Sequence, residues 1–431
     1  MRNDGHPAGS WYAETAAIRL PALPAPEGEV RTGVCIVGAG FTGLGAALAL
    51  ARAGVPCMVL EAARVGSGAS GRNGGQAHPG HRQDQAWLEA RVGAEEALRL
   101  WTLAEAARAH LADLLAEVAP EADYRPGLIV ARHRPGGEGQ DAAHIDHMAR
   151  VYGCEALSLV SREDLAAELG TDAYHGGILD RDGGHLHPLN LALGLARAVL
   201  AAGGRICEQA PALSWSRRGG AIEVATPTGR IVCDRLVLTG DGYLTDIAGA
   251  ARDRVMPINN FVLVTEPLGE RADQILRSGA AVADTRFVVN YFRKTADGRL
   301  LFGGGETYRE TYPDDLAGYV RRSLVKIYPD LADVRITHAW GGSVGVTFNR
   351  TPLVAYPAPG VSLAAGYSGQ GVLLAPYIGD LLGREAQGDR AAAEALESVH
   401  RLPAPAFPGG RWLRRPLTVA GLTWYALRDR L

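Results

Sequence analysis

The feature that most constrains the fold of this chain is a strand, a glycine-rich turn, a helix and a second strand close to the N-terminus. Residues 34–37 form a short apolar run rich in β-branched side chains, which ends at the turn 38–43 (GAGFTG). Alanine and leucine recur at helical spacing in 41–53, and a second apolar run, 55–60, ends at Glu61. This order predicts a βαβ unit, and the wholly apolar strands predict a parallel sheet that is covered on both faces.

The turn has the GxGxxG spacing of a dinucleotide-binding fingerprint. Gly38 would form the tight turn, Gly40 would let a pyrophosphate approach the backbone, and Gly43 would let the helix pack closely on the strand. The helix N-terminus offers free N–H groups to phosphates. Glu61 follows Gly38 by 23 residues, where a carboxylate accepts hydrogen bonds from ribose hydroxyls and favours FAD or NAD over NADP. An ordinary βαβ unit with a glycine-rich turn is the alternative.

Two further glycine-rich loops favour FAD over NAD. In 66–76 (GSGASGRNGGQ), small residues would let the backbone lie against the pyrophosphate and the flavin ring, with Arg72, Asn73 and Gln76 as donors. The loop 366–371 (GYSGQG) opens a helix whose N–H groups would stabilise negative charge on the reduced ring. Each loop alone is compatible with a plain turn, but the three together predict a flavin.

Nucleotide-type patterns lie near both ends and in the middle of the chain, and strand patterns lie between them. The periodicity predicts helices at 84–118, 161–169, 188–202, 314–327 and 372–386. It predicts strands at 123–132, 205–207, 220–225, 229–240, 255–265, 286–293, 299–304 and 361–365. We therefore expect an FAD-binding domain made of 31–120, 185–250 and 346–400, interleaved with a second domain made of 121–184 and 251–345. An extended N-terminal arm, 1–30, and a C-terminal tail, 401–431, complete the chain.

The composition indicates a compact globular protein, with 47% hydrophobic and 21% charged residues. Lys and Arg number 44 and Asp and Glu 47, so the net charge of −3 predicts no nucleic-acid partner. Five widely spaced cysteines argue against a disulfide framework and a metal site, and they favour a cytoplasmic location. The N-terminus lacks a signal-peptide pattern, and without a run of ~18 apolar residues we expect no membrane span. Monomer and homo-oligomer both stay open.

Several motifs together resemble one family of flavoproteins. The segments 37–44 (VGAGFTGL), 60–64 (LEAAR) and 68–76 (GASGRNGGQ) are similar to the D-amino-acid oxidase superfamily of FAD enzymes. A narrower resemblance, to its γ-glutamylputrescine oxidase-like members, rests on 123–127 (DYRPG), 183–192 (GGHLHPLNLA), 302–305 (FGGG), 366–369 (GYSG), 407–411 (FPGGR) and 427–431 (LRDRL). The likeness runs nearly from end to end.

The resemblance implies a Rossmann-type FAD-binding domain and an antiparallel-sheet substrate domain, as in D-amino-acid and glycine oxidases. It implies oxidation of an amine such as γ-glutamylputrescine, an intermediate of putrescine breakdown. Hydride would pass to flavin N5, the imine would hydrolyse to aldehyde and ammonia, and O2 would accept the electrons to give H2O2. The residues expected to contact FAD are Gly38, Gly40, Phe41, Thr42, Gly43, Glu61, Ala62, Arg64, Gly68, Ala69, Ser70, Arg72, Asn73, Gly74, Gly75, Gln76, Ala212, Gly240, Gly366, Tyr367, Gly369, Gln370, Gly371 and Val372.

Four features near the expected flavin bear on the substrate. The segments 78–81 (HPGH) and 346–349 (VTFN) depart from the relatives, and Gln370 stands where they have histidine, so the exact amine stays open. An amino-acid oxidase binds the substrate α-carboxylate, usually through an arginine. Alignment places that position near Val344, which favours a substrate without a carboxylate at the reacting carbon, although Arg350 would compensate.

The candidate catalytic residues are His78, Tyr291, Arg293, Trp340 and Gln370. His78 would line the flavin face or tether FAD covalently, and we expect non-covalent FAD. Tyr291 and Arg293 share a strand face and would hold a distal carboxylate of the substrate, or would form sheet surface. Trp340 would wall an aromatic slot for the amine together with Tyr367, or would pack in the core.

Three alternatives to the amine oxidase stay open. One is an oxidase of N-substituted amino acids, similar to glycine and sarcosine oxidases. The second is a dehydrogenase that passes electrons to an acceptor other than O2. The third is a flavin-binding protein without turnover.

Overall fold

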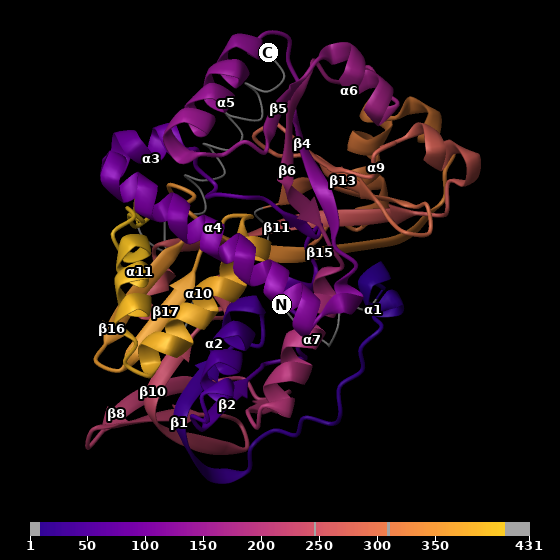
Figure 1. Ribbon diagram of the computed structural model, residues 1–431. Helices are drawn as coiled ribbons and strands as arrows, with labels where there is room; N and C mark the ends of the chain where they lie inside the picture. The colour runs from indigo at the N-terminus through magenta and orange to yellow at the C-terminus, as the bar shows by residue number, and fades with distance from the viewer. Residues whose placement is uncertain (1–8, 245–246, 308–310, 410–431) are drawn as a thin grey trace.

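The chain folds around two β-sheets that lie one above the other in Figure 1. The computed structural model describes residues 9–244, 247–307 and 311–409. Along the chain, β1 and β2 belong to the lower or first sheet, β3 to β6 to the upper or second sheet, and β7 to β10 again to the first. Strands β11 to β15 return to the second sheet, and β16 and β17 close the first. The domain boundaries within these alternations remain a prediction.

The first sheet is largely parallel. In the described part of the chain its order is β16-β17-β10-β1-β2-β7, with β9 beside β10 and β8 beside β9. The neighbours from β17 to β7 run parallel, as the apolar strands predict, and β16 pairs antiparallel with β17. The strands are β1 (Gly28–Val37), β2 (Cys57–Leu60), β7 (Arg205–Cys207), β8 (Ser214–Arg218), β9 (Ala221–Ala225), β10 (Gly229–Leu238), β16 (Leu353–Ala358) and β17 (Val361–Ala365).

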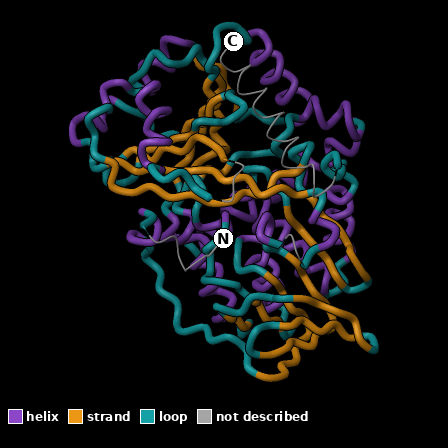
Figure 2. The backbone as a smooth tube through the Cα atoms, turned by 180° about the vertical axis from the view of Figure 1, so that it is seen from behind, coloured by secondary structure: helices purple, strands orange, loops and turns teal. Residues whose placement is uncertain are grey.

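The second sheet crosses the upper half of the molecule, where Figure 2 shows its long strands from behind. Its order in the described residues is β15-β11-β14-β13-β12-β4-β6-β3, with β5 beside β6. The pairs are antiparallel as expected, but β4 and β12 run parallel. The strands are β3 (Gln76–Ala77), β4 (Arg125–Ala131), β5 (Leu157–Val160), β6 (Gly177–His185), β11 (Val255–Thr265), β12 (Ala281–Asp284), β13 (Tyr291–Lys294), β14 (Leu300–Thr307) and β15 (Ile336–Thr347).

Helices cover both sheets. Near the first sheet lie α2 (Phe41–Arg52), α4 (Ala94–Glu117), α7 (Pro188–Ala201), α10 (Gly371–Ala386) and α11 (Arg390–His400), with α8 (Gly249–Arg252) beside β16. The upper half carries α3 (Gln85–Val92), α5 (Glu138–Tyr152), α6 (Arg162–Leu169) and α9 (Leu316–Ile327). In the described chain, no helix has the length and apolar character needed to cross a membrane.

The strand register brings distant segments to one edge of the first sheet. Val37, the last residue of β1, pairs with Leu60 in β2 and with Leu238 in β10. Leu238 pairs in turn with Leu363 in β17. Because parallel strands end at the same edge, the segments after β1, β10 and β17 meet there, as at the ligand-binding edge of open α/β sheets.

Several expectations about single elements were wrong. The helix expected over 84–118 is divided into α3 and α4, because Gly93 adopts a φ of 85° and ends α3. The N-terminal arm is not wholly extended: Trp11–Thr15 forms α1, where the Ser10 side chain accepts from the N–H of Ala13. The strand expected over 286–293 begins only at Tyr291. Strands β3, β5, β6, β8, β12, β15 and β16 and helices α5, α8 and α11 were not predicted.

Buried His187 links α1 to α7 and predicts acid sensitivity. Its Nδ1 accepts the N–H of Asn190 (3.1 Å) at the start of α7, so the ring must be neutral. Burial, with the nearby charge of Arg293, lowers the pKa of His187 to about 3. The unfolded chain, with a histidine pKa near 6.5, therefore binds more protons than the native chain between these values, and stability falls as pH drops below 6.5.

The variant His187→Asn tests this cause. Asparagine is also a good helix N-cap but does not titrate. We expect the loss of unfolding free energy between pH 7 and pH 5, from urea melts, to be about 2 kcal/mol smaller in His187→Asn than in the wild type. Equal pH dependence in the two proteins would contradict the assignment.

Candidate active site

Three loops meet at the carboxyl edge of the first sheet. The N–H of Phe41, at the start of α2, donates to Ser70 Oγ (3.0 Å). The hydroxyls of Thr42 and Tyr367 lie 2.7 Å apart, although 325 positions separate these residues. The structure thus brings together the fingerprint, the loop 66–76 and the loop 366–371.

Glu61 lies at the end of β2 and faces the fingerprint. Its two carboxylate oxygens accept the N–H groups of Ala39 (2.8 Å) and Ala63 (2.9 Å). Burial raises the pKa of Glu61, and these hydrogen bonds act in the opposite direction. Glu61 therefore stands where the carboxylate that hydrogen-bonds the adenosine ribose is found in dinucleotide-binding folds.

The remaining residues expected near the adenosine end lie around the same edge. A Cβ on Gly38 would lie 3.1 Å from Gly240 Cα. The N–H of Ala210 donates to the carbonyl of Glu61 (2.8 Å). Ala212 follows two residues later in the chain, so it lies close to this edge of the sheet. Ala62 and Arg64 are exposed.

The loop 66–76 uses its polar side chains mainly to hold its own shape. Arg72 donates to the carbonyls of Ser67 and Gly341, and the Asn73 amide donates to the carbonyls of Ala69 and Ser70. The Gln76 amide donates to Val282 O (2.8 Å). All three expected donor residues line the cavity described below, but these bonds already engage the amide groups of Asn73 and Gln76 and two of the five N–H groups of Arg72.

Asp241, which follows β10, is a site residue that the sequence reasoning missed. Its Oδ1 accepts the N–H of Gly366 (2.6 Å), and its Oδ2 accepts the N–H of Gly345 (2.8 Å). Burial raises the pKa of this carboxyl, and the backbone donors lower it. One side chain therefore joins Gly366, the first residue of the loop 366–371, to β15. In the sequence, the run Gly240-Asp241-Gly242 directly after an apolar strand could have indicated that Asp241 belongs to the site.

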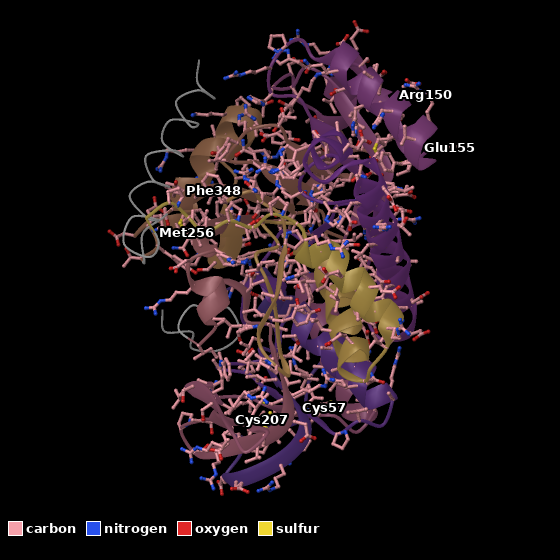
Figure 3. All side chains as sticks on the ribbon, turned by 90° about the vertical axis from the view of Figure 1, so that its left-hand side faces the viewer. Cys57, Arg150, Glu155, Cys207, Met256 and Phe348 are labelled. Atoms are coloured by element: carbon pink, nitrogen blue, oxygen red, sulfur yellow. The ribbon has the colours of Figure 1, made fainter. Side chains whose placement is uncertain are left out.

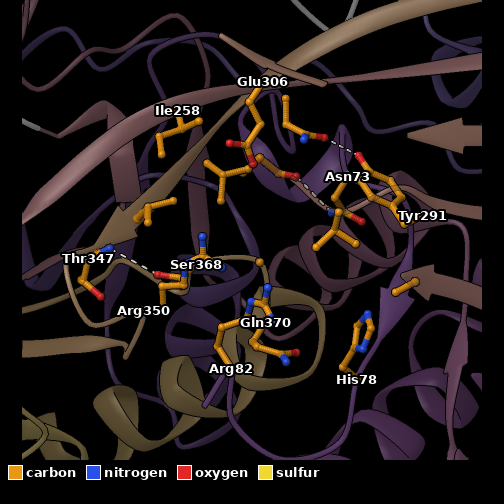
Figure 4. Close-up of a pocket in the computed structure, with 18 of the residues that line it drawn as sticks. Asn73, His78, Arg82, Ile258, Tyr291, Glu306, Thr347, Arg350, Ser368 and Gln370 are labelled. Carbon is orange, nitrogen blue, oxygen red and sulfur yellow. Dashed lines mark hydrogen bonds between the residues drawn. The ribbon is translucent and has the colours of Figure 1, made fainter. Parts of the chain in front are cut away.

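A cavity of about 840 Å³ lies between these loops and the second sheet (Figure 4). The loops contribute Ala69, Gly74, Gly369 and Val372 to its wall. The sheet side contributes apolar residues, including Met256, Ile258, Val344, Val346 and Phe348. Figure 3 shows Met256 and Phe348 close together, well above Cys57 and Cys207 of the first sheet. A cavity of this size is in the range of small-molecule sites.

Of the candidate catalytic residues, His78, Tyr291 and Gln370 line the cavity (Figure 4). Gln370 precedes α10, and its Oε1 is buried without a hydrogen-bond partner among the described residues. The Tyr291 hydroxyl donates to Asn260 Oδ1 (2.5 Å). A Cβ on Gly74 would lie 2.5 Å from the Tyr291 ring, so glycine at this position leaves the space that the ring occupies.

His78 is neutral at physiological pH. Burial, together with the charge of Arg82, lowers its pKa to about 4. Its Nε2 lies 3.1 Å from Gln76 Oε1. Because the Gln76 amide nitrogen donates elsewhere, the Gln76 oxygen accepts and Nε2 carries the proton. Nδ1 is then the acceptor of the ring.

Arg293 and Trp340 are placed differently from the expectation, because neither belongs to the cavity wall. Arg293 is 4% exposed, and its guanidinium donates to Gly74 O, Leu186 O and the Tyr12 hydroxyl. The Trp340 indole N–H donates to Arg72 O (2.9 Å). Both side chains hold the glycine loop against the second sheet, so we assign neither to substrate contact.

An apolar residue stands in the cavity wall at the position where amino-acid oxidases carry their carboxylate-binding arginine. Val344 lines the cavity on β15. Besides Arg72, two arginines line the cavity: Arg82 follows the glycine loop, and Arg350 follows β15. The Arg350 guanidinium lies 4.2 Å from the centre of the Phe287 ring. Of the two departing segments, 78–81 contributes His78 to this wall, and 346–349 contributes Val346, Thr347 and Phe348.

The residues of this edge fit FAD. The glycine turn, the N-terminus of α2 and Glu61 supply what a pyrophosphate and a ribose need. The loops around 74 and 370 adjoin a cavity with a buried unpartnered oxygen, Gln370 Oε1. Their small residues leave room for a planar ring.

Comparison with known proteins decides the family. The family model of the DAO FAD-dependent oxidoreductases matches residues 33–385. The chain belongs to this family. It is an FAD-dependent oxidoreductase, and the expected resemblance and cofactor are confirmed.

DAO family proteins with similar sequences match along nearly the whole chain. A probable oxidoreductase OrdL of Rhizobium meliloti is 42% identical over 424 residues, which is 98% of each chain. The gamma-glutamylputrescine oxidoreductase of Escherichia coli is 35% identical over 428 residues, again 98% of each. A glycine oxidase structure from Bacillus cereus superimposes with a TM-score of 0.69 at 18% identity, covering 83% of this chain and 96% of that one. The last match confirms the fold class.

Proposed function

We propose that this DAO family enzyme oxidises the terminal amine of an N-acylated diamine such as γ-glutamylputrescine. The observation that carries the proposal is the apolar wall at Val344. An amino-acid oxidase has to neutralise a carboxylate on the reacting carbon. The full-length relative that is named for γ-glutamylputrescine supports the same class of substrate.

The chain's own groups suit the binding of a neutral amine. FAD, when bound, accepts a hydride from the carbon next to nitrogen. His78 stays uncharged and presents Nδ1 as an acceptor for a substrate N–H. Gln370 Oε1 is a second acceptor at the wall. Tyr291, held by Asn260, lines the cavity beside Gly74. The imine product would hydrolyse to aldehyde and ammonia, and we assign O2 as the electron acceptor.

A substrate panel tests the proposal. We expect γ-glutamylputrescine to give equal amounts of aldehyde and H2O2 in air, with kcat/KM at least about 100-fold above sarcosine and glycine. Sarcosine or another N-alkyl amino acid as the better substrate would refute the proposal. It would favour the second candidate, in which Arg82 or Arg350 binds the α-carboxylate. Aldehyde formation only with an artificial acceptor would show a dehydrogenase.

The pH profile of kcat/KM gives an independent prediction. A primary amine has a pKa near 10, so its neutral fraction rises about tenfold per pH unit below that value. His78, with a pKa of about 4, adds no titration above pH 6. We expect log kcat/KM to rise with a slope near one from pH 6 to pH 8, measured by initial rates. A plateau with a pKa near 6.5 that His78→Asn removes would contradict the neutral histidine.

A further inference from the structure

The cavity wall holds two arginines, Arg82 and Arg350, that the proposed chemistry does not use. Arg82 and Arg350 both line the cavity, on segments joined by a hydrogen bond from the Gln83 amide to Asn349 O (2.8 Å). Phe348, beside Arg350 in sequence, also lines the cavity and is 55% exposed, so this end adjoins the surface. The end at the flavin loops is formed by buried residues such as Gly74 and Gln76.

The two guanidinium groups affect each other. Burial, and next the charge of Arg350, lowers the pKa of Arg82 to about 10, and Glu306 across the cavity acts in the opposite direction. Within the described part of the chain, no ion pair joins Arg82 to a carboxylate. Two like charges repel each other in a partly enclosed cavity, and a bound carboxylate would interact favourably with both. Arginine binds a carboxylate through two parallel N–H donors.

We propose that Arg82, with Arg350 beside it, binds a carboxylate on the acyl end of the substrate. This inference rests on the proposed function and assigns the residues that select the acyl group. It explains why the cavity has an apolar wall at Val344 and also two arginines in its lining. A γ-glutamyl group has its carboxylate at the far end, whereas a simple acyl group has none.

The test compares two diamines that differ only in this carboxylate, N-glutarylputrescine and N-butyrylputrescine. For the wild type we expect kcat/KM to be about 30- to 100-fold higher with the glutaryl compound, as charge-assisted hydrogen bonds predict. Arg82→Gln should abolish this preference, chiefly through a higher KM for the glutaryl compound. Arg82→Lys, which keeps the charge but not the fork, should give an intermediate preference.

Arg91→Gln is the matched control, because Arg91 is exposed on α3 and lies over the Trp87 ring. It should keep the wild-type preference. If Arg82→Gln fails to retain flavin, Arg350→Gln should reduce the preference in the same way. A wild type that does not distinguish the two amines, or variants that slow both equally, would overturn the proposal.

A binding measurement separates this inference from the proposed function. N-Glutarylethylamine has the acyl carboxylate but no amine, so its affinity can be measured by calorimetry without turnover. We expect Arg82→Gln to weaken it about 30-fold. If no amine reduces the flavin but this loss is seen, the proposed reaction fails and the carboxylate site stands. Equal affinity in the wild type and Arg82→Gln would refute the site.

Discussion

Gly43→Ala is expected to yield protein without bound flavin and with a lower melting temperature. A Cβ at this position would lie 1.9 Å from the carbonyl oxygen of Gly38 and 2.7 Å from Thr239 Oγ1. The first is backbone of the tight turn, and the second donates to Val37 O (2.8 Å), so neither moves freely. Separating α2 from β1 displaces the phosphate-binding turn. We expect a loss of about 3 kcal/mol in unfolding free energy, measured by urea melts alongside flavin absorbance.

Gly139→Ala is the matched control for this substitution. Gly139 lies in α5, and a Cβ there would meet nothing within 4 Å. Alanine in a helix is favoured over glycine by up to about 1 kcal/mol. This variant should keep full flavin and a melting temperature at or above that of the wild type. A Gly43→Ala protein with the same properties would contradict the close packing.

Asp241→Asn is the second change with a large expected effect. The carboxylate accepts the N–H groups of Gly366 and Gly345 with different oxygens, but an amide has only one acceptor oxygen. Asparagine fits the left-handed backbone at this position, where φ is 48°, so the effect isolates the lost hydrogen bond. We expect a loss of about 2 kcal/mol in stability and an FAD dissociation constant about tenfold higher, measured by flavin fluorescence during titration.

Asp315→Asn makes the same chemical change where it should have no effect. Asp315 caps α9 by accepting the N–H of Gly318 (2.8 Å) at an exposed position. Asparagine caps helices as well as aspartate does. Stability and FAD affinity should match the wild type. If Asp241→Asn is equally silent, Asp241 does not hold the flavin loop.

The sequence predicts the parts of the site that are encoded by local chemistry. The turn 38–43, the loop 66–76 and the loop 366–371 are recognisable because glycine spacing follows directly from the backbone geometry. The residue types alone did not show that Tyr291 lines the cavity whereas Arg293 donates hydrogen bonds to the carbonyls of Gly74 and Leu186. Which groups a side chain contacts depends on long-range packing.

The elements that the sequence did not predict also depend on long-range packing. Strand β15 contains Gly341, Gly342 and Gly345, which weaken a strand pattern, but pairing with β11 along its length stabilises it. Asp241 was missed because its partners, Gly345 and Gly366, are more than 100 positions away. The motifs at 407–411 and 427–431 lie partly or wholly outside the described residues.

Anaerobic reduction of the bound flavin tests the central claim most directly. The purified protein is mixed with γ-glutamylputrescine without oxygen, and the visible absorbance of the flavin is followed over time. We predict that the flavin band bleaches within seconds and returns on admission of air with H2O2, whereas sarcosine leaves it unchanged. A flavin that only an N-alkyl amino acid reduces, or that no amine reduces, would contradict the account.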